Sequence, residues 1–472
     1  MGQRGPAGER AEADEATRGS AIKLGTELLA RLINIATSFL IARHYGVEAF
    51  GLFGWLSEAA VVVAEAADLG IQGLASQALV AGTLSLRSMA RAKLAVSGLV
   101  ILAALAAAGV APVLSPLVVY LVLAGWSEFL GVALRARGDR LQESAVIFCL
   151  RLSLLVLLVA AIDLGAGLPA LAWAHAASAL PAVVLGAYLV RRRAAPGGGV
   201  AGVLPVLRRS APLAVNGGLA LLSLRVELLL MGVLVGPFAT GLFLAALKVV
   251  QFLNVVPSAV CAGAMPSLTR EALRGGDGVR RRTAASLAFL ALPAAAGVAL
   301  VAPGLVGLFG PGFVAAAPAL RVLAGAVVPL FFNALLVAAL IATERAAWLP
   351  RLTAVRVAVA GGLAWLLVPR LEAVGAALGF LASEVLLLLL AARACGAAGF
   401  PVRLSGPLLR AAAATLPMAV LVALAPARLP AAVALGVAAY GATLALARRW
   451  SPALLRDLFG DVRYAEGGEG KP

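Results

Sequence analysis

Long apolar runs recur along the whole chain, and they restrict its fold more than any other feature. Each run is roughly 20 residues long, the length that an α-helix needs to cross the hydrocarbon core of a bilayer. The 472 residues are 62% hydrophobic and only 13% charged. A water-soluble fold of this size does not need so much apolar surface. We therefore predict an all-α, polytopic membrane protein.

The runs predict fourteen transmembrane helices joined by short links. They lie at about 21–43, 50–74, 91–111, 114–134, 142–163, 168–190, 211–235, 239–263, 284–308, 316–341, 347–369, 372–392, 407–426 and 429–447. Some spans contain a proline, which leaves a backbone carbonyl without its donor and predicts a kink. These prolines are Pro181, Pro212, Pro257, Pro293, Pro329 and Pro417.

A short motif after the first span returns before the eighth. The segment Gly46-Val47-Glu48-Ala49-Phe50-Gly51-Leu52-Phe53 matches Gly236-Pro237-Phe238-Ala239-Thr240-Gly241-Leu242-Phe243 at five positions without a gap. Such an echo indicates an internal repeat. Six spans separate the copies, so both halves enter the membrane in the same direction, and their symmetry axis lies along the membrane normal. The predicted parts are a tail (1–20), an N-lobe of spans 1–6 (21–195), a C-lobe of spans 7–12 (205–395), spans 13 and 14 (405–447) and a second tail (448–472).

Lys and Arg concentrate in the two tails and the even-numbered links. The odd-numbered links hold only Arg43, Arg370 and Arg428. By the positive-inside rule, both termini are cytoplasmic. The net charge of +16 does not indicate a nucleic-acid partner, because the basic residues are scattered over short links.

Charged side chains inside the spans are candidate functional residues, because each costs about 2.5–3.5 kcal/mol at a helix centre. The basic ones are Arg31, Arg151, Arg225, Lys248, Arg321 and Arg356, and the acidic ones are Glu27, Glu58, Glu65, Asp68, Glu128, Glu227 and Glu384. Arg321 lies close enough to a helix end to reach the surface. Spans 1, 2, 7 and 8 each carry one polar face, so we predict a polar lumen between the two halves.

An excess of Arg and Lys in that lumen favours an anionic passenger, and the Arg fork suits phosphate oxygens. The candidate substrate-binding residues are Arg31, Arg225, Lys248, Arg151, Arg356, Gln251, Asn254 and Asn34. The candidates for coupling or charge balance are Glu27, Glu58, Glu65, Asp68 and Glu227.

Several alternatives stay open at these positions. Glu27 and Arg31 could form an i,i+4 ion pair that only supports packing. Arg151 and Arg356 could pair with Glu128 or Glu384. The cysteines and histidines show no metal-binding spacing, so no cofactor or metal is predicted, and coupling to H⁺ or Na⁺ is undecided. The cysteines are Cys149, Cys261 and Cys395, and the histidines are His44 and His175.

The two repeated openings also resemble a known family. The first reads Ile41-Ala42-Arg43-His44-Tyr45-Gly46, Gly51-Leu52-Phe53 and Asp68-Leu69-Gly70, and the second reads Arg225-Val226-Glu227, Gly236 and Gly241-Leu242-Phe243. They resemble the polysaccharide-export flippases of the multidrug/oligosaccharidyl-lipid/polysaccharide superfamily. Many members have Asp in place of Glu227, and most have Tyr in place of Phe243.

The resemblance implies two six-helix lobes that open alternately to either side of the bacterial inner membrane. The implied substrate is an undecaprenyl-diphosphate-linked oligosaccharide, moved from the cytoplasmic to the outer leaflet, with glycan polymerase or ligase enzymes as partners. Basic residues of the central cavity would hold the diphosphate. Only Arg31, Arg225 and Lys248 lie in the helices and at the depths that this role implies.

Other classes fit the sequence less well. A multidrug or cation antiporter of the same superfamily would favour acidic lumen residues, and a lipid II flippase would also have fourteen spans. The link at 83–89 lacks the Gly-x-x-x-Asp-Arg type of signature of major-facilitator transporters. The outer links are too short for the catalytic loop of a membrane glycosyltransferase, so we predict that the protein is not an enzyme.

Overall fold

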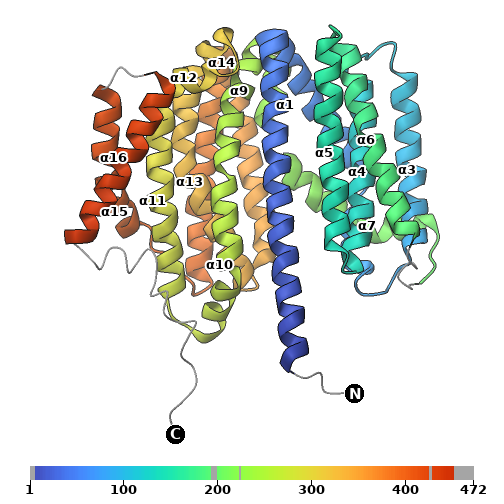
Figure 1. The fold of residues 1–472 in the computed structure, drawn as a ribbon, viewed down its shortest axis with the longest axis horizontal. Coiled ribbons are helices and arrows are strands. Elements are labelled where there is room, and N and C mark those ends of the chain that lie inside the picture. The colour runs from blue at the N-terminus through green and yellow to red at the C-terminus, as the bar shows by residue number, and fades with distance from the viewer. Residues whose placement is uncertain (1–5, 193–198, 223–224, 425–427, 451–472) are drawn as a thin grey trace. The chain divides into compact units, whose positions relative to one another are not determined.

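The computed structural model describes residues 6–192, 199–222, 225–424 and 428–450, and all regular elements in these ranges are helices. This confirms the predicted all-α class (Figure 1). The elements are α1 (Pro6–Asp68), α2 (Ile71–Ala78), α3 (Leu86–Ala106), α4 (Leu114–Ala136), α5 (Arg140–Asp163), α6 (Leu168–Arg191), α7 (Val203–Leu222), α8 (Val226–Leu234), α9 (Pro237–Leu253), α10 (Val255–Arg274), α11 (Gly278–Leu300), α12 (Ala302–Gly307), η1 (Pro311–Ala316), α13 (Ala317–Ala342), η2 (Ala346–Trp348), α14 (Leu349–Ala397), α15 (Ser405–Leu424) and α16 (Leu429–Trp450).

Within the described ranges, 11 helical segments are long and apolar enough to cross a membrane. One of them, Ala346–Ala397, contains two arms that join at Glu372, whose φ of 46° is not helical. A Cβ placed on Gly379 would lie 3.4 Å from the backbone nitrogen of Ala364. Residues 15 positions apart would lie about 22 Å apart in a straight helix, so α14 folds back on itself. These arms correspond to the predicted spans 347–369 and 372–392, while the total of fourteen stays a prediction.

The internal repeat has a counterpart in the backbone. Gly46 has φ 79° and ψ −176°, and Gly236 has φ 84° and ψ −176°. This region of φ/ψ space is accessible almost only to glycine. Each glycine interrupts the helical backbone and is followed by a new helical segment, so the repeated motif encodes the same turn twice.

The chain divides into two compact units, residues 1–222 and 223–472. The boundary falls inside the predicted seventh span (211–235), whereas we expected it between residues 195 and 205. The reason is that α7 packs against α1, α2 and α3 of unit 1. At Gly70, a Cβ would lie 2.5 Å from the backbone nitrogen of Ala214, so α7 lies directly on the turn between α1 and α2.

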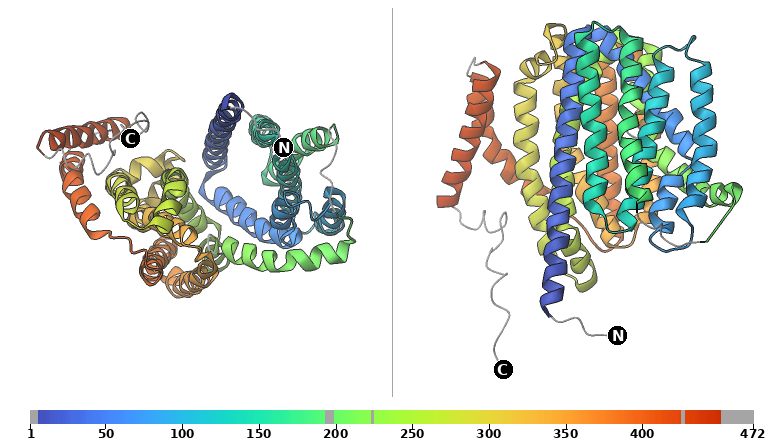
Figure 2. Two further views of the ribbon diagram at one scale, coloured as in Figure 1. Left: turned by 90° about the horizontal axis from the view of Figure 1, so that it is seen from below. Right: turned by 45° about the vertical axis from the view of Figure 1, so that its right-hand side comes forward.

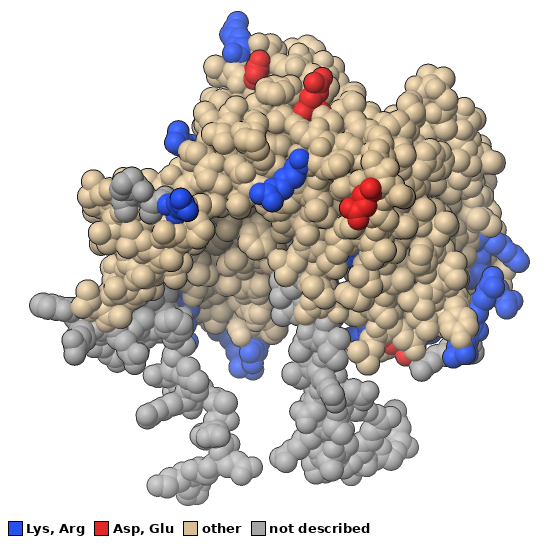
Figure 3. Space-filling view, turned by 45° about the horizontal axis from the view of Figure 1, so that its top comes forward, with Lys and Arg blue, Asp and Glu red and all other residues tan. Residues whose placement is uncertain are grey.

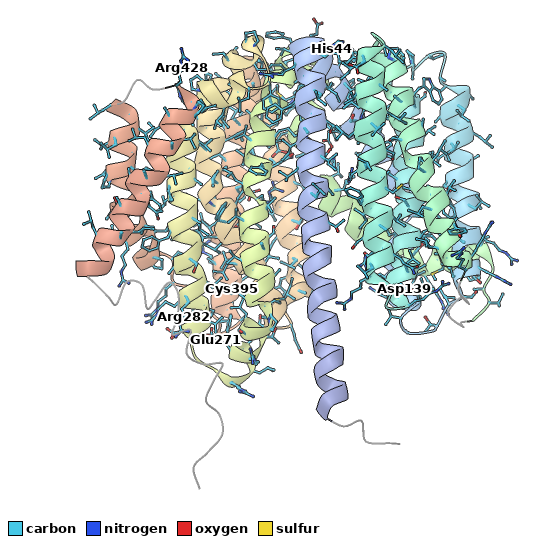
Figure 4. The ribbon with its side chains drawn as sticks, viewed as in Figure 1. His44, Asp139, Glu271, Arg282, Cys395 and Arg428 are labelled. Atoms are coloured by element: carbon cyan, nitrogen blue, oxygen red, sulfur yellow. The ribbon has the colours of Figure 1, made fainter. Side chains whose placement is uncertain are left out.

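Unit 1 is built around α4, which packs against α1, α3, α5 and α6 (Figure 1). Two-thirds of its apolar window is buried, whereas less than a quarter of the window in α3 is buried. His44 and Asp139 lie at opposite ends of this unit (Figure 4). That placement fits the prediction that the link after span 1 and the link after span 4 lie on opposite sides of the membrane.

Unit 2 is built around α13, which packs against α9, α10, α11 and α14 and buries Phe331 and Phe332 completely. Helices α15 and α16 lie at the edge of this unit, where α15 packs against α11 (Figure 2). The Tyr440 hydroxyl of α16 donates a hydrogen bond of 2.6 Å to the carbonyl of Phe289 in α11.

The outer surface suits a lipid environment. Many large apolar side chains are exposed, including Val184, Leu99 and Trp365. Most of the surface turned toward the viewer in Figure 3 is uncharged, and basic side chains gather at its right-hand and lower edges. An apolar surface of this extent is favourable only where acyl chains cover it.

Candidate functional site

Unit 1 holds a network of charged side chains that begins at the end of α1. Asp68 forms an ion pair with Lys93 of α3, in which the side chains are 13% and 4% exposed. The other Asp68 oxygen accepts a 3.0 Å hydrogen bond from the backbone N–H of Gln72. The Lys93 ammonium also lies 6.0 Å from the Trp126 ring centroid and 5.8 Å from that of Phe129. The network therefore surrounds this cation with a carboxylate and two aromatic rings.

The structure corrects the sequence interpretation of Lys93. That interpretation placed Lys93 at the cytoplasmic start of span 3 and counted it with the preceding link. Helix α3 begins at Leu86 rather than near residue 91, because the Ser85 hydroxyl caps it by accepting from the backbone N–H of Ser88. The earlier start places Lys93 two turns inside the helix. The cap pattern of Ser85 was the signal that could have located it.

The network continues through α4 and α5. Glu128 accepts a 2.8 Å hydrogen bond from the Gln72 side chain, and its charge acts on Glu65 together with those of Asp68 and Lys93. Arg151 hydrogen bonds with the buried Tyr120, which also lies near Glu128. Unit 1 thus brings together the predicted residues Glu65, Asp68, Glu128 and Arg151 and adds Lys93. Three carboxylates face two cations, so the network can balance its own charge or accept a proton or a monovalent cation.

A second buried cluster lies in unit 2. Arg356 and Glu384, from the two arms of α14, form a 2.6 Å ion pair in which the side chains are 5% and 4% exposed. Asn333 of α13 donates to the other Glu384 oxygen at 2.7 Å. Glu227 of α8 is 2% exposed, and the charges of Arg356 and Glu384 both act on it. Of the two roles considered for Arg356, pairing with Glu384 is the one that the structure supports.

Two further predicted cations lie near each other in the same unit. Arg225 precedes α8 and Lys248 lies in α9, and the charge of Arg225 acts on Lys248. Both side chains are half-buried. Like charges in a segment of low dielectric repel each other strongly, so an anion that contacted both side chains would reduce this repulsion.

Helix α9 ends at Leu253, shortly after Lys248. Gln251 is exposed on α9, and the exposed Asn254 stands between α9 and α10. Pro257 explains the break, because a proline ring clashes with the carbonyl four residues earlier, here that of Leu253. The predicted polar face of span 8, which contains Lys248, Gln251 and Asn254, therefore ends at a kink.

The remaining candidates are less completely described. The side chains of Glu27 and Arg31 lie outside the described part of the structure, so their assignments stay predictions. Asn34 is exposed and Glu58 is half-buried. His175 is buried and its ring contacts those of Phe53 and Tyr120. In the described residues, no group of three or more His, Cys, Asp or Glu side chains could hold a metal ion.

Comparison with known proteins gives a match to one family model and to several solved structures. A family model described as "Polysaccharide biosynthesis protein" matches residues 89–318. A search of curated proteins by sequence finds no match. The matched range includes the second of the two openings, and the description of the family model agrees with the family that the openings resemble.

Solved structures match over most of the chain. A lipid II flippase, MurJ, in an inward closed conformation aligns with a TM-score of 0.71 at 9% identity, over 91% of this chain and 99% of that one. An inward-facing multidrug resistance MATE family transporter of the MOP superfamily aligns with a TM-score of 0.63 at 16% identity, over 80% and 98%. An outward-facing MATE family structure aligns with a TM-score of 0.57 at 17% identity, over 83% and 93%. The fold is therefore that of membrane transporters and flippases.

Proposed function

We propose that this protein is a flippase for a lipid-linked oligosaccharide. The substrate would carry its glycan on an undecaprenyl diphosphate and cross from the cytoplasmic to the outer leaflet of the bacterial inner membrane by alternating access. Glycan polymerase or ligase enzymes would then act on the flipped product. The fold shared with a flippase and the polysaccharide biosynthesis family match support this assignment.

The observation that carries the proposal is the neighbouring pair Arg225 and Lys248. Two cations held near each other in an apolar helical region favour an anionic group that can contact both of them. A diphosphate offers several oxygens and more than one negative charge, so it can satisfy the planar Arg fork and the Lys ammonium together. A cationic drug would meet repulsion at the same place.

The test is transport by the purified protein in proteoliposomes. A fluorescent undecaprenyl-diphosphate oligosaccharide is placed in both leaflets, and an impermeant reductant reports which molecules have crossed. The variant Arg225→Ala with Lys248→Ala should slow flipping by roughly 100-fold, because each hydrogen bond to a charged group contributes about 1.5–3 kcal/mol.

Two control variants separate charge from folding. Arg321→Ala removes an exposed cation of the same unit and should leave flipping unchanged. The exchange Arg225→Lys with Lys248→Arg keeps both charges and should retain most of the flipping activity. Unchanged flipping in the double alanine variant, with the protein still folded, would show that this site assignment is wrong. Preferential flipping of lipid II in the same vesicles would favour the lipid II alternative.

A cation antiporter is the second candidate, because the charged network of unit 1 holds three carboxylates, Glu65, Asp68 and Glu128, against two cations. Under that hypothesis these carboxylates bind H⁺ or Na⁺ and drive a cationic substrate out. Proteoliposomes with an imposed pH or Na⁺ gradient distinguish the two functions. Gradient-dependent uptake of a lipophilic cation, without flipping of the lipid-linked glycan, would favour the antiporter.

A further inference from the structure

A cavity of about 590 Å³ opens at one end of unit 1, and Phe129, whose ring lies near Lys93, forms part of its lining. It lies where α3 begins and where α4 and α6 end. Its lining residues are Leu86, Arg87, Ala90, Phe129, Leu130, Arg137, Ala187, Val190, Arg191 and Arg192. The volume is within the range of about 300–1,000 Å³ that is typical of small-ligand sites.

The polar part of the lining is entirely cationic. Four arginines converge on the cavity from three elements, and no Asp or Glu is among the lining residues. Arginines at helix ends are common because they interact favourably with the C-terminal dipole. That effect acts on each helix separately and does not explain why side chains from three elements share one cavity.

Two of these arginines are held in place by other contacts. Arg137 donates a 3.0 Å hydrogen bond to the carbonyl of Val190, which links the end of α4 to α6. The guanidinium of Arg192 lies 4.5 Å from the ring centroid of Tyr188. A site whose donors are already positioned loses less conformational entropy when an anion binds.

The rest of the lining is apolar and leads to the lipid-facing surface. Leu86, Phe129 and Leu130 form part of the wall. On the adjoining stretch of α6, Val184 and Tyr188 are 66% and 48% exposed. A ligand that fits both surfaces has an anionic group at one end and hydrocarbon at the other.

We propose that this cavity binds the phosphate headgroup of an anionic membrane phospholipid, with the arginines around the phosphate and the acyl chains along α6. The four arginines lie in the links and helix ends that the positive-inside rule assigns to the cytoplasmic side, where anionic lipids attract basic clusters. None of the lining residues is among the predicted substrate-binding or coupling residues, so this inference does not depend on which substrate is transported.

The experiment measures lipid binding directly, by native mass spectrometry of the purified full-length protein. The protein is titrated in detergent with short-chain phosphatidylglycerol, short-chain phosphatidylcholine and inorganic phosphate in separate arms. Arg87→Gln with Arg191→Gln removes two exposed cavity arginines. Arg208→Gln with Arg209→Gln removes two exposed arginines of α7 in the same unit, which lie outside the cavity lining.

The wild type should bind phosphatidylglycerol in preference to phosphatidylcholine. The cavity variant should bind it about 30-fold more weakly, while the α7 variant should stay within about threefold of the wild type. Equal weakening in both variants, or equal binding of the two lipids, overturns the proposal. If inorganic phosphate competes fully with phosphatidylglycerol and binds as tightly by itself, the site takes a free phosphate and the lipid assignment is wrong. Melting curves of both variants without lipid show whether they remain folded.

Discussion

Arg356 and Glu384 form a 2.6 Å ion pair between the two arms of α14, and both side chains are at least 95% buried. The pair joins two helices of the predicted C-lobe at a depth where each charge alone would be costly. Asn333 and Glu227 complete its surroundings. The stability of unit 2 therefore depends on both charges of this pair.

Loss of Arg356 should destabilise unit 2 strongly. Arg356→Ala leaves two buried carboxylates without this cation, which should cost about 3–5 kcal/mol of folding free energy. The loss is measured as a lower melting temperature in detergent. Arg351→Ala, an exposed position of the same helix, should change stability by less than about 0.5 kcal/mol. The double variant Arg356→Met with Glu384→Gln should recover most of the loss, because it removes both charges and keeps an acceptor for Asn333.

The Asp68 and Lys93 pair should behave as one energetic unit. Asp68→Asn and Lys93→Met each leave one charge without its partner, and their combination removes both. A double-mutant cycle on melting stability should give a coupling energy of about 0.5–3 kcal/mol, while Arg91→Ala on the exposed side of α3 should be nearly neutral. Additive losses would contradict the pairing. If the double variant also keeps wild-type transport, Asp68 balances charge and does not bind a coupling ion.

The sequence predicted the helical fold because the bilayer demands long apolar runs. It predicted the internal repeat from five matching residues, and the structure adds that both copies place a glycine at the same non-helical backbone conformation, at Gly46 and Gly236. It also left two roles open for Arg356, and pairing with Glu384 was one of them. Neither the placement of Lys93 inside α3 nor that of α7 in unit 1 followed from hydropathy. The first depends on a single cap residue, and the second on tertiary packing at Gly70.

The equivalent turns at Gly46 and Gly236 should respond alike to substitution. Alanine at either position must adopt a positive φ with an extended ψ, which costs about 1–3 kcal/mol. Open space surrounds both positions, since a Cβ would meet no atom within 4 Å, so the cost comes from the backbone alone. Gly263→Ala is the control, because it lies in helix α10 with equally open space and should be neutral or slightly stabilising. Melting temperatures that fall for only one of the two turns would contradict their equivalence.

The hairpin of α14 should depend on the small size of Gly375. A Cβ at this position would lie 2.5 Å from the carbonyl oxygen of Leu367. This distance is shorter than the van der Waals contact distance of a carbon and an oxygen. Gly375→Ala must push the two arms apart near Glu372 and should destabilise the protein by about 1–3 kcal/mol, the usual penalty for overpacking. Gly362→Ala provides a matched control on the same helix, because a Cβ there would meet no atom within 4 Å. The melting temperature in detergent should fall for Gly375→Ala and stay level or rise for Gly362→Ala. Equal stability of the two variants would mean that the arms do not approach each other as closely as the backbone indicates.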